Sequence, residues 1–219
     1  MGGWQSFSFR IIVTSQEAFY THSTDLRDLS HPIVVLRSTS EPLTLRVPQV
    51  GDLQALIDVL ANPENTKNDL SVASLSAEER EVVCRRWLTL DDPPTYMNFI
   101  VIDTERGREE PVGIAGLGWI GPADTESDES VRVGAAGVMM NPEARRKGYG
   151  TEGLKMIIEY GLRELGLVEV RVGTHSSNIA MRRLMEVKLH MEPEVEEKGD
   201  RFGNDLLWRI NQENWSSLR

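Results

Sequence analysis

The stretch that constrains the fold most runs from residue 131 to residue 175. Residues 131–140, VRVGAAGVMM, read as a strand, and the basic loop NPEARRKGYGTEG follows at 141–153. Apolar residues then recur at helical spacing over 154–165, and Gly166 stands where a helix end favours positive φ. VEVRVGTH at 168–175 reads as another strand. A strand therefore leads through a glycine-containing loop into a helix and on to a strand, which indicates a mixed α/β fold.

Similar patterns predict the elements that precede this unit. LTLRV at 43–47 reads as a strand, an amphipathic helix is expected from Val50 to Leu60, and Asn62 with Pro63 signals a turn. Ser76 and Glu79 have the spacing of a capping box, which predicts a helix that residues 91–94 end. Residues 96–103 and 111–120 are expected to form a hairpin, since the charged turn TERGREE separates them.

Both ends of the chain are predicted in less detail. FSFRIIV at 7–13 alternates as a strand does, a polar stretch follows, and PIVVL at 32–36 is apolar again. We therefore divide the chain into an N-terminal extension, 1–40, made of extra strands or an arm, and one domain, 41–219. Near the C-terminus we expect a helix over 178–187 and then a strand pair. The helix would bury Ala180, Leu184 and Val187, and the last strand would alternate Leu206, Trp208 and Ile210.

Composition excludes some partners. The formal net charge is −10, which argues against a nucleic-acid partner held by phosphate neutralisation. No stretch approaches the roughly 18 uninterrupted apolar residues of a membrane helix, so no membrane partner is expected. Cys84 is the one cysteine; it can form no internal disulfide and is expected to be buried, which fits a cytoplasmic protein. No pattern predicts a metal site.

The loop at 141–153 has the properties of an anion site. The first backbone N–H groups of a helix lack intrahelical partners and carry partial positive charge. Gly148 and Gly150 allow a close approach of the backbone, and Arg145, Arg146 and Lys147 add full charges. We therefore expect a polyanionic ligand, with a diphosphate held by the backbone amides.

Three ligands with a diphosphate come into question. A nucleoside-triphosphate loop needs a lysine after its last glycine, and here Lys147 precedes Gly148, so that interpretation fails. Gly148, Gly150 and Gly153 match the spacing of a dinucleotide-binding turn, but Arg171 stands near the strand end where an acidic ribose partner belongs. The remaining interpretation is coenzyme A.

Here the chain resembles the GNAT family of N-acetyltransferases. Arg145-Arg146-Lys147-Gly148-Tyr149-Gly150 matches the family's Arg/Gln-x-x-Gly-x-Gly/Ala loop, and Asn178 stands where relatives keep an asparagine near the coenzyme. The order of elements is similar from about residue 42 to residue 211, and the chain looks closest to the branch of ribosomal-protein N-terminal acetyltransferases and their small-amine relatives. The resemblance implies a twisted, mostly antiparallel sheet with flanking helices and a splayed central strand pair.

The resemblance also implies how acetyl-CoA, the co-substrate, is held. Val138 and Met140 would pair with the pantetheine arm through their backbone, and amides from Arg146 through Thr151 would hold the pyrophosphate. The Thr151 hydroxyl would meet a phosphate or cap the helix, and Asn178 would contact the pantetheine or cap its own helix. The ring of Tyr149 is expected to pack. A solvent-exposed helix face is expected at 182 and 183, with a contact to the 3′-phosphate as the alternative.

The catalytic groups are harder to assign. Transfer of an acetyl group to an amine needs a neutral nitrogen, and hence a base for a lysine-like amine. The chain departs from the family by carrying Ala135 where many relatives have glutamate, and Met185 where many have tyrosine. Glu129, in an acidic loop, and His175, at a strand end, are the candidate bases, with a solvated loop and a surface histidine as the alternative interpretations.

We conclude from the sequence that the protein is an acetyl-CoA-dependent N-acetyltransferase. The acceptor is expected to be a protein N-terminus or a small cationic amine, and a homodimer is possible. The alternative is a non-catalytic acyl-CoA-binding module, which Ala135 and Met185 motivate. Trp87 and Trp119 are expected either to line the acceptor site or to lie in the core.

Overall fold

The computed structural model describes residues 10–13, 19–25, 32–105, 109–123 and 130–217, of which residues 10–13 are described by their backbone alone. The strands in these ranges are β1 (Arg10–Val13), β2 (Tyr20–Asp25), β3 (Ile33–Ser38), β4 (Leu43–Arg46), β5 (Met97–Asp103), β6 (Glu110–Pro122), β7 (Arg132–Met140), β8 (Glu169–Thr174), β9 (Glu194–Val195) and β10 (Leu206–Ile210). The helices are α1 (Leu53–Ala61), α2 (Pro63–Thr66), α3 (Leu70–Ala73), α4 (Ala77–Arg86), α5 (Tyr149–Arg163), α6 (Ile179–Arg182) and α7 (Gln212–Ser216). None of these helices is long and apolar enough to cross a bilayer.

The described strands form one sheet in the order β1-β2-β3-β4-β5-β6-β7-β8-β10-β9. Its neighbours are antiparallel except for β7 and β8, which α5 connects and which run parallel. The β7–β8 pairing covers only 133–135 against 169–171, so the two strands diverge beyond Ala135. The predicted mixed α/β fold, with a mostly antiparallel sheet and a splayed central pair, is confirmed.

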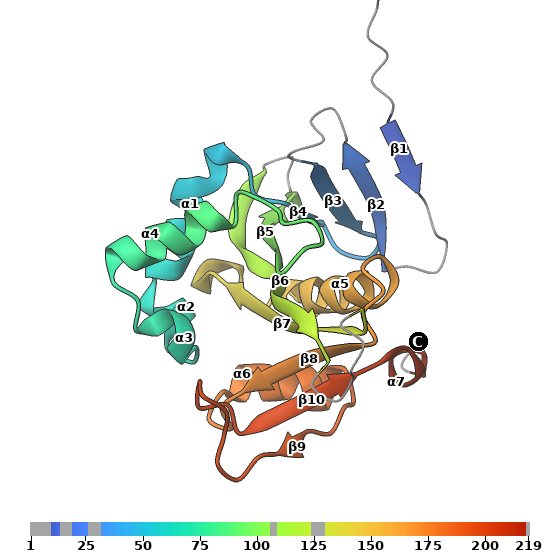
Figure 1. Cartoon of the computed structure of the whole chain (residues 1–219). Coiled ribbons are helices and arrows are strands. Elements are labelled where there is room, and N and C mark those ends of the chain that lie inside the picture. The colour runs from blue at the N-terminus through green and yellow to red at the C-terminus, as the bar shows by residue number, and fades with distance from the viewer. Residues whose placement is uncertain (1–9, 14–18, 26–31, 106–108, 124–129, 218–219) are drawn as a thin grey trace, which may run out of the picture.

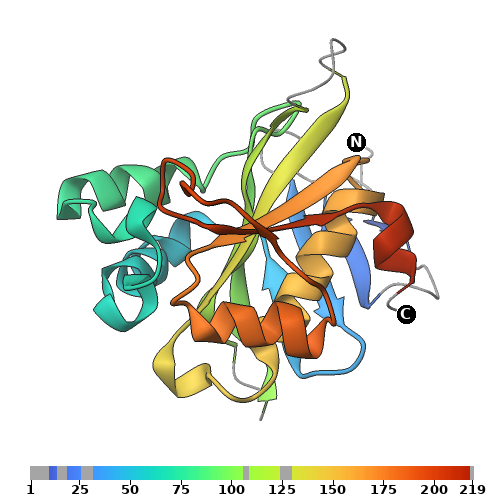
Figure 2. The same cartoon turned by 90° about the horizontal axis from the view of Figure 1, so that it is seen from below.

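Helices cover both faces of the sheet (Figures 1 and 2). On one face, α1 and α4 pack over Ile100, Ile102 and Ile114, and Cys84 is fully buried among them, as expected. On the other face, α5 packs over Phe99 and Val101 in the larger core. Because β5 alternates between the two cores, it is buried along nearly its whole length.

Several local predictions are confirmed. The β5–β6 hairpin forms. The Ser76–Glu79 capping box begins α4, with the Glu79 N–H 3.1 Å from Ser76 Oγ and the Ser76 N–H 2.8 Å from Glu79 Oε2. Gly166 has φ +64°. The inward alternation in β10 holds, because Leu206, Trp208 and Ile210 are buried and lie between exposed or half-buried neighbours.

Three predictions of local structure are wrong. Asn62 and Pro63 begin α2, because Asn62 Oδ1 accepts from the Glu64 N–H at 3.0 Å and proline suits a first helical position. Helix α4 ends at Arg86, before the expected stop at 91–94, and the Tyr96 hydroxyl lies 2.7 Å from the Arg86 carbonyl oxygen.

The third concerns the buried face of α6. A π-helical turn over 183–188 continues α6, and the Leu189 N–H donates to the Leu184 carbonyl. This wider turn changes the phase of the helix. The residues packed into the core are therefore Met181, Met185 and Leu189, with Leu184, while Ala180 and Val187 are exposed.

The N-terminal strands extend the sheet beyond β4. β3 pairs with β4 through Leu36 and Leu45, both fully buried, and β2 pairs with β3. β1 lies within the strand expected at 7–13, of which residues 7–9 fall outside the described part. β2 was not predicted, because among its residues only Tyr20 is buried and the apolar pattern is therefore weak.

The contribution of this region to the core can be measured with Leu36→Ala. Since Leu36 is fully buried, its truncation is expected to lower the free energy of unfolding by about 2–5 kcal/mol. The neighbouring Arg37 is exposed, so Arg37→Ala should change it by less than about 0.5 kcal/mol. Urea unfolding measures both, and equal effects of the two variants would contradict the packing of β3.

Candidate active site

The loop between β7 and α5 presents a run of free backbone donors. Arg146 and Gly148 have left-handed backbones, with φ +67° and +89°, and α5 begins at Tyr149. Among the described residues, the N–H groups of 146–151 donate to no protein acceptor, and the first bond of the helix is from Glu152 N–H to the Gly148 carbonyl. Consecutive free amides at the positive end of a helix form an anion cradle. We call residues 146–151 the cradle.

The three cations beside the cradle have different surroundings. Arg145 turns back into the protein: Nε donates to the Met140 carbonyl at 2.9 Å, and NH2 donates to the Glu64 carbonyl and Asn65 Oδ1, each at 2.8 Å. Asn65 in turn donates to Asn141 Oδ1 at 2.7 Å. Arg145 therefore ties α2 to the end of β7, and its guanidinium is engaged before any ligand arrives.

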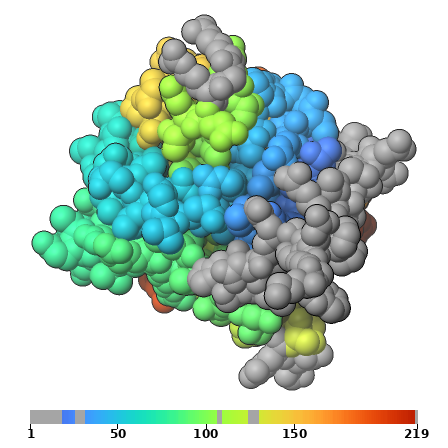
Figure 3. Space-filling model, turned by 90° about the horizontal axis from the view of Figure 1, so that it is seen from above, coloured from blue at the N-terminus to red at the C-terminus, as the bar shows by residue number. Residues whose placement is uncertain are grey.

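Lys147 also has a partner within the protein. Its ammonium lies 3.0 Å from Asp103 and 3.5 Å from Glu105, at the end of the β5–β6 hairpin. Figure 3 shows the yellow loop segment beside this light-green hairpin end. Partial burial raises the pKa of Asp103, but hydrogen bonds from the Glu105 N–H and from Lys147 outweigh it and leave that pKa low. The same hydrogen bond raises the pKa of Lys147.

The neighbouring residues Tyr149 and Arg146 complete this picture. The ring of Tyr149 is 2% exposed, as expected, and the pKa of its phenol is raised by burial and by a hydrogen bond to Asp103. Arg146 is exposed and has no ion-pair partner in the described ranges. Of the three cations, Arg146 alone has a guanidinium or ammonium group that is available for a ligand.

Residues of the N-terminal region hold the cradle from the other side, which sequence reasoning missed. Glu152, 6% exposed in the first turns of α5, accepts from Ser38 Oγ at 2.5 Å and Ser40 Oγ at 2.9 Å. Glu41, in the same turn, has its Oε1 3.6 Å from where a Cβ on Gly148 would lie. Other charged residues lie in the same helical stretch, so nothing in the sequence singled out Glu152.

The β7 edge next to the cradle faces the gap that opens toward β8. Beyond Ala135, this edge has no strand partner on the β8 side. Val138 and Met140 lie there, with their side chains packed in the α5 core. The Met140 carbonyl accepts from Arg145, so that group is occupied.

The candidate catalytic residues receive little support from the geometry. Glu129 lies outside the described residues. His175 is exposed, and its Nδ1 accepts from the Ser177 N–H at 3.1 Å. The lone pair of the neutral ring is therefore engaged, because the other nitrogen then carries the proton. Ala135 is exposed, whereas Met185 is fully buried in the core. Neither of these two positions offers a titratable group.

Residues of the first turn of α6 are held by local contacts. Asn178 caps the helix, with Oδ1 accepting from the Met181 N–H at 3.2 Å and Nδ2 donating to Thr174 Oγ1 at 2.9 Å. Arg182 pairs with Glu186 at 2.9 Å, and Arg183 is exposed. Thr151, half-buried in the first turn of α5, makes no hydrogen bond to a described side chain.

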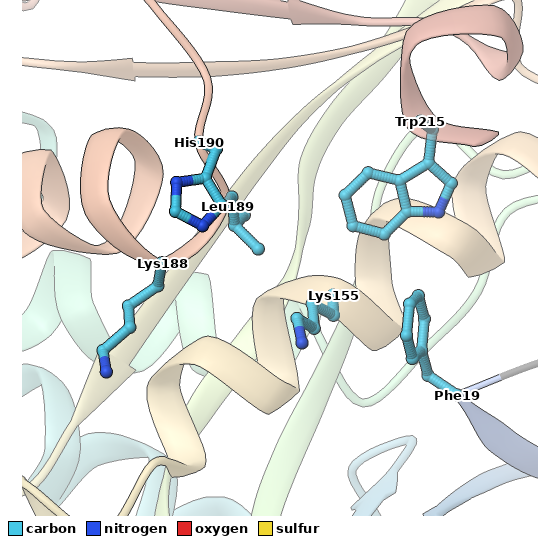
Figure 4. Close-up of a pocket in the computed structure, with 6 residues that line it drawn as sticks. All are labelled: Phe19, Lys155, Lys188, Leu189, His190 and Trp215. Atoms are coloured by element: carbon cyan, nitrogen blue, oxygen red, sulfur yellow. The ribbon is translucent and has the colours of Figure 1, made fainter. Parts of the chain in front are cut away.

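A separate small pocket lies on the α5 side, between α5, the end of the π-helical turn and α7 (Figure 4). Its lining is Phe19, Lys155, Lys188, Leu189, His190 and Trp215. The Lys155 ammonium lies 5.2 Å from the centre of the Phe19 ring. A volume of about 90 Å³ is far below the roughly 300 Å³ at which ligand pockets begin. This pocket is therefore too small to hold a coenzyme.

Comparison with known proteins agrees with this geometry. A family model described as an acetyltransferase (GNAT) domain matches residues 42–192. A search of curated protein sequences finds no match. The mostly antiparallel sheet rules out a parallel dinucleotide-binding fold, and the third glycine of that motif, Gly153, packs within α5 against Ala115.

Solved structures share the fold at low sequence identity. Spermidine N-acetyltransferase from Vibrio cholerae, in complex with CoA and spermine, is 18% identical with a TM-score of 0.61, over 80% of this chain and 98% of that one. RimL, a ribosomal alpha-N-protein acetyltransferase, is 13% identical with a TM-score of 0.62, over 83% and 96%. An acetyltransferase from Agrobacterium tumefaciens is 16% identical with a TM-score of 0.60, over 96% and 100%.

The family model covers more than half of the chain and includes the cradle, the diverging strands and Asn178. The fold of these acetyltransferases extends over most of the described sheet. The protein belongs to the GNAT family of N-acetyltransferases.

Proposed function

We propose that the protein transfers an acetyl group from acetyl-CoA directly to an amine. The observation that carries the proposal is the run of unbonded backbone N–H groups at 146–151, beside the gap between β7 and β8. A diphosphate supplies the acceptors that these donors lack. The predicted cytoplasmic location and homodimer stay predictions within the same proposal.

The residues present fit the coenzyme. A Cβ on Gly150 would meet only Met140 Cγ, at 3.6 Å, so the space above the first turn of α5 is open to a ligand. The pantetheine arm would pair with the free edge of β7 near Val138, in the manner of an added strand. The thioester would then reach the gap near Gly137, whose α-carbon has open space above it. Spermidine N-acetyltransferase from Vibrio cholerae, which shares the fold, was solved in complex with CoA, and this supports coenzyme A as the ligand.

The chemistry needs little from the side chains. The amine nitrogen attacks the thioester carbonyl carbon, a C–N bond forms, the C–S bond breaks, and coenzyme A leaves as the thiolate. The proton on the nitrogen passes to solvent. For a lysine-like amine, reaching the neutral form at pH 7 costs about 4–5 kcal/mol. Ala135 and Met185 supply no base, so water is the acceptor of the proton in this proposal, with Glu129 as the remaining candidate side chain.

A second candidate function is an acyl-CoA-binding module without turnover. It is favoured by the exposed methyl group of Ala135 and the core position of Met185, where neither residue can transfer a proton. Release of coenzyme A thiol with a set of peptides, polyamines and other amines separates the two functions. Thiol release with any of these acceptors rules out the binding module.

The cradle can be tested with Gly150→Asp. The new side chain fits sterically but places a carboxylate among donors meant for phosphate, so the Kd for acetyl-CoA is expected to rise about 100-fold or more. The control is Gly51→Asp, which adds the same charge at the short turn before α1, where a Cβ meets nothing within 4 Å. Calorimetric titration of acetyl-CoA into the parent and both variants measures the three Kd values. An unchanged Kd in Gly150→Asp would contradict the cradle.

The different roles of Arg146, which is free for a ligand, and Arg145, which ties α2 to the end of β7, give a further prediction. Arg146→Ala should weaken acetyl-CoA binding about 5- to 10-fold at low salt, and less at high salt, with unchanged stability. Arg145→Ala should instead lower the free energy of unfolding by about 1–3 kcal/mol, because the Met140 and Glu64 carbonyls lose their donor. Urea unfolding and titration at two salt concentrations measure this. A reversed pattern would show that Arg145 is the ligand contact.

A further inference from the structure

A polar side chain with an unused donor lies inside the central sheet. Asn98 is 8% exposed on β5, between the buried Met97 and Phe99. Its Nδ2 has no hydrogen-bond partner in the described part of the protein. An unpaired buried N–H group costs about 1–3 kcal/mol. A residue that carries this cost in a core strand calls for an explanation in terms of a ligand.

The strand register fixes the face on which Asn98 lies. Ile100 pairs with Ile114, and both belong to the core under α1 and α4. Asn98 pairs with Gly116, and Gly116 pairs with Gly137 on β7. Because side chains alternate along a strand, Asn98 lies on this same face, one pair of residues further along. Its Oδ1 would be 2.5 Å from a Cβ on Gly116, so the Asn98 side chain lies over β6 at Gly116.

The sheet is bare beside this amide. We define the glycine strip as Gly116, Gly118, Ala135 and Gly137. Gly118 and Gly137 have nothing within 4 Å of the place where a Cβ would lie, and these two residues and Ala135 are exposed. The strip ends at the edge of β7 where β8 diverges. The side chain of Asn98, with its unpaired donor, therefore lies on the same face as an open strip that leads to the gap proposed for the thioester.

Two contacts connect the segment between α2 and α3 with segments that follow β8 in the chain, near the β8 side of the gap. Asn68 Nδ2 lies 3.4 Å from Asn178 Oδ1, and Leu70 lies 3.3 Å from where a Cβ on Gly203 would be. Residues 68–70, between α2 and α3, thus contact both the start of α6 and the loop before β10.

We propose that Asn98 selects the acceptor by donating from Nδ2 to a carbonyl oxygen next to the reacting amine. The acceptor is then the α-amino group of a peptide or protein N-terminus, a class that a polyamine does not belong to. This inference rests on the proposed function. In an N-terminal residue the nitrogen and the carbonyl oxygen are about 3 Å apart. With a hydrogen bond of about 2.9 Å, this reach covers the spacing of about 4.8 Å between β6 and β7.

The chemistry of the two acceptor classes favours the same choice. A protonated polyamine offers only N–H donors, so it cannot satisfy the Asn98 N–H, and the glycine strip bears no carboxylate for its other charges. An α-amino group has a pKa of about 7.8, against about 10.4 for an alkylamine, so its neutral fraction near pH 7 is about 400-fold greater. An acceptor of this kind reacts without a strong base, which agrees with Ala135 in β7.

The test uses the full chain and measures coenzyme A thiol release. The acceptors are tetrapeptides that differ in their first residue, an Nα-acetylated peptide with one lysine, and spermidine. In the parent, kcat/KM is expected to be highest for a tetrapeptide with a free N-terminus. Asn98→Leu should lower that kcat/KM at least 10-fold and leave the Kd for acetyl-CoA unchanged, and its Tm should be equal or higher because the unpaired donor is gone.

Two further variants sharpen the result. Asn98→Asp replaces the donor by an acceptor and should raise the ratio of spermidine to peptide activity. Gln54→Leu, an amide-to-leucine change on the exposed side of α1, should leave every rate unchanged. The inference is overturned if spermidine is the better acceptor for the parent, or if Asn98→Leu acetylates peptides as the parent does. If none of these acceptors leads to thiol release, the proposed function is overturned, and this inference with it.

Discussion

The divergence of β7 from β8 is the constraint on which the rest of the site depends. Helix α5 packs closely over β8 and β6: a Cβ on Gly161 would lie 2.9 Å from Val170 and 3.4 Å from Leu117. At its other end, α5 is fixed to the β3–β4 turn through Glu152, Ser38 and Ser40. The helix thus lies across the sheet, and its free N-terminus is positioned at the open end of the gap (Figure 1).

Backbone groups, more than side-chain charges, make this gap a binding site. Arg145 is used to join α2 to β7, and Lys147 is paired with two carboxylates. What remains for an anion is the row of amides at 146–151 and the exposed Arg146. The protein has a net charge of −10 and leaves few cationic side chains for the anion. Fixed dipoles at a helix end can attract an anion without the cost of ordering long side chains.

The two faces of the sheet have different parts in the proposed reaction. Helix α5, which begins in the cradle, covers one face, whereas the strand register places the glycine strip and Asn98 on the face under α1 and α4. Within the described sheet, the two faces meet at the gap, where β7 and β8 are no longer paired. Small residues on the strip leave room for a substrate, and the unpaired amide gives that substrate an orientation. Both features lower the stability of the central sheet, which is common at functional sites.

The sequence by itself determined the features that depend on neighbouring residues. These include the strand, loop, helix and strand over 131–175, the β5–β6 hairpin, the capping box at Ser76 and the anion loop with Gly148. Periodicity and local hydrogen bonds fix such elements within a few residues of chain. The resemblance to a family then supplied the mostly antiparallel sheet and its central splay.

Only the tertiary structure decided which groups are free and which are engaged. Arg145 finds one of its acceptors, Asn65, 80 residues away, and Glu152 finds Ser38 at a separation of 114. Within the described residues, Asn98 Nδ2 has no hydrogen-bond partner, and the strand register places Asn98 opposite a glycine, which offers no side chain. The phase of the helix after Asn178 likewise depends on a wider turn that lets Met185 and Leu189 enter the core. A linear pattern shows which residues can donate or accept, but contacts between distant segments determine what they meet.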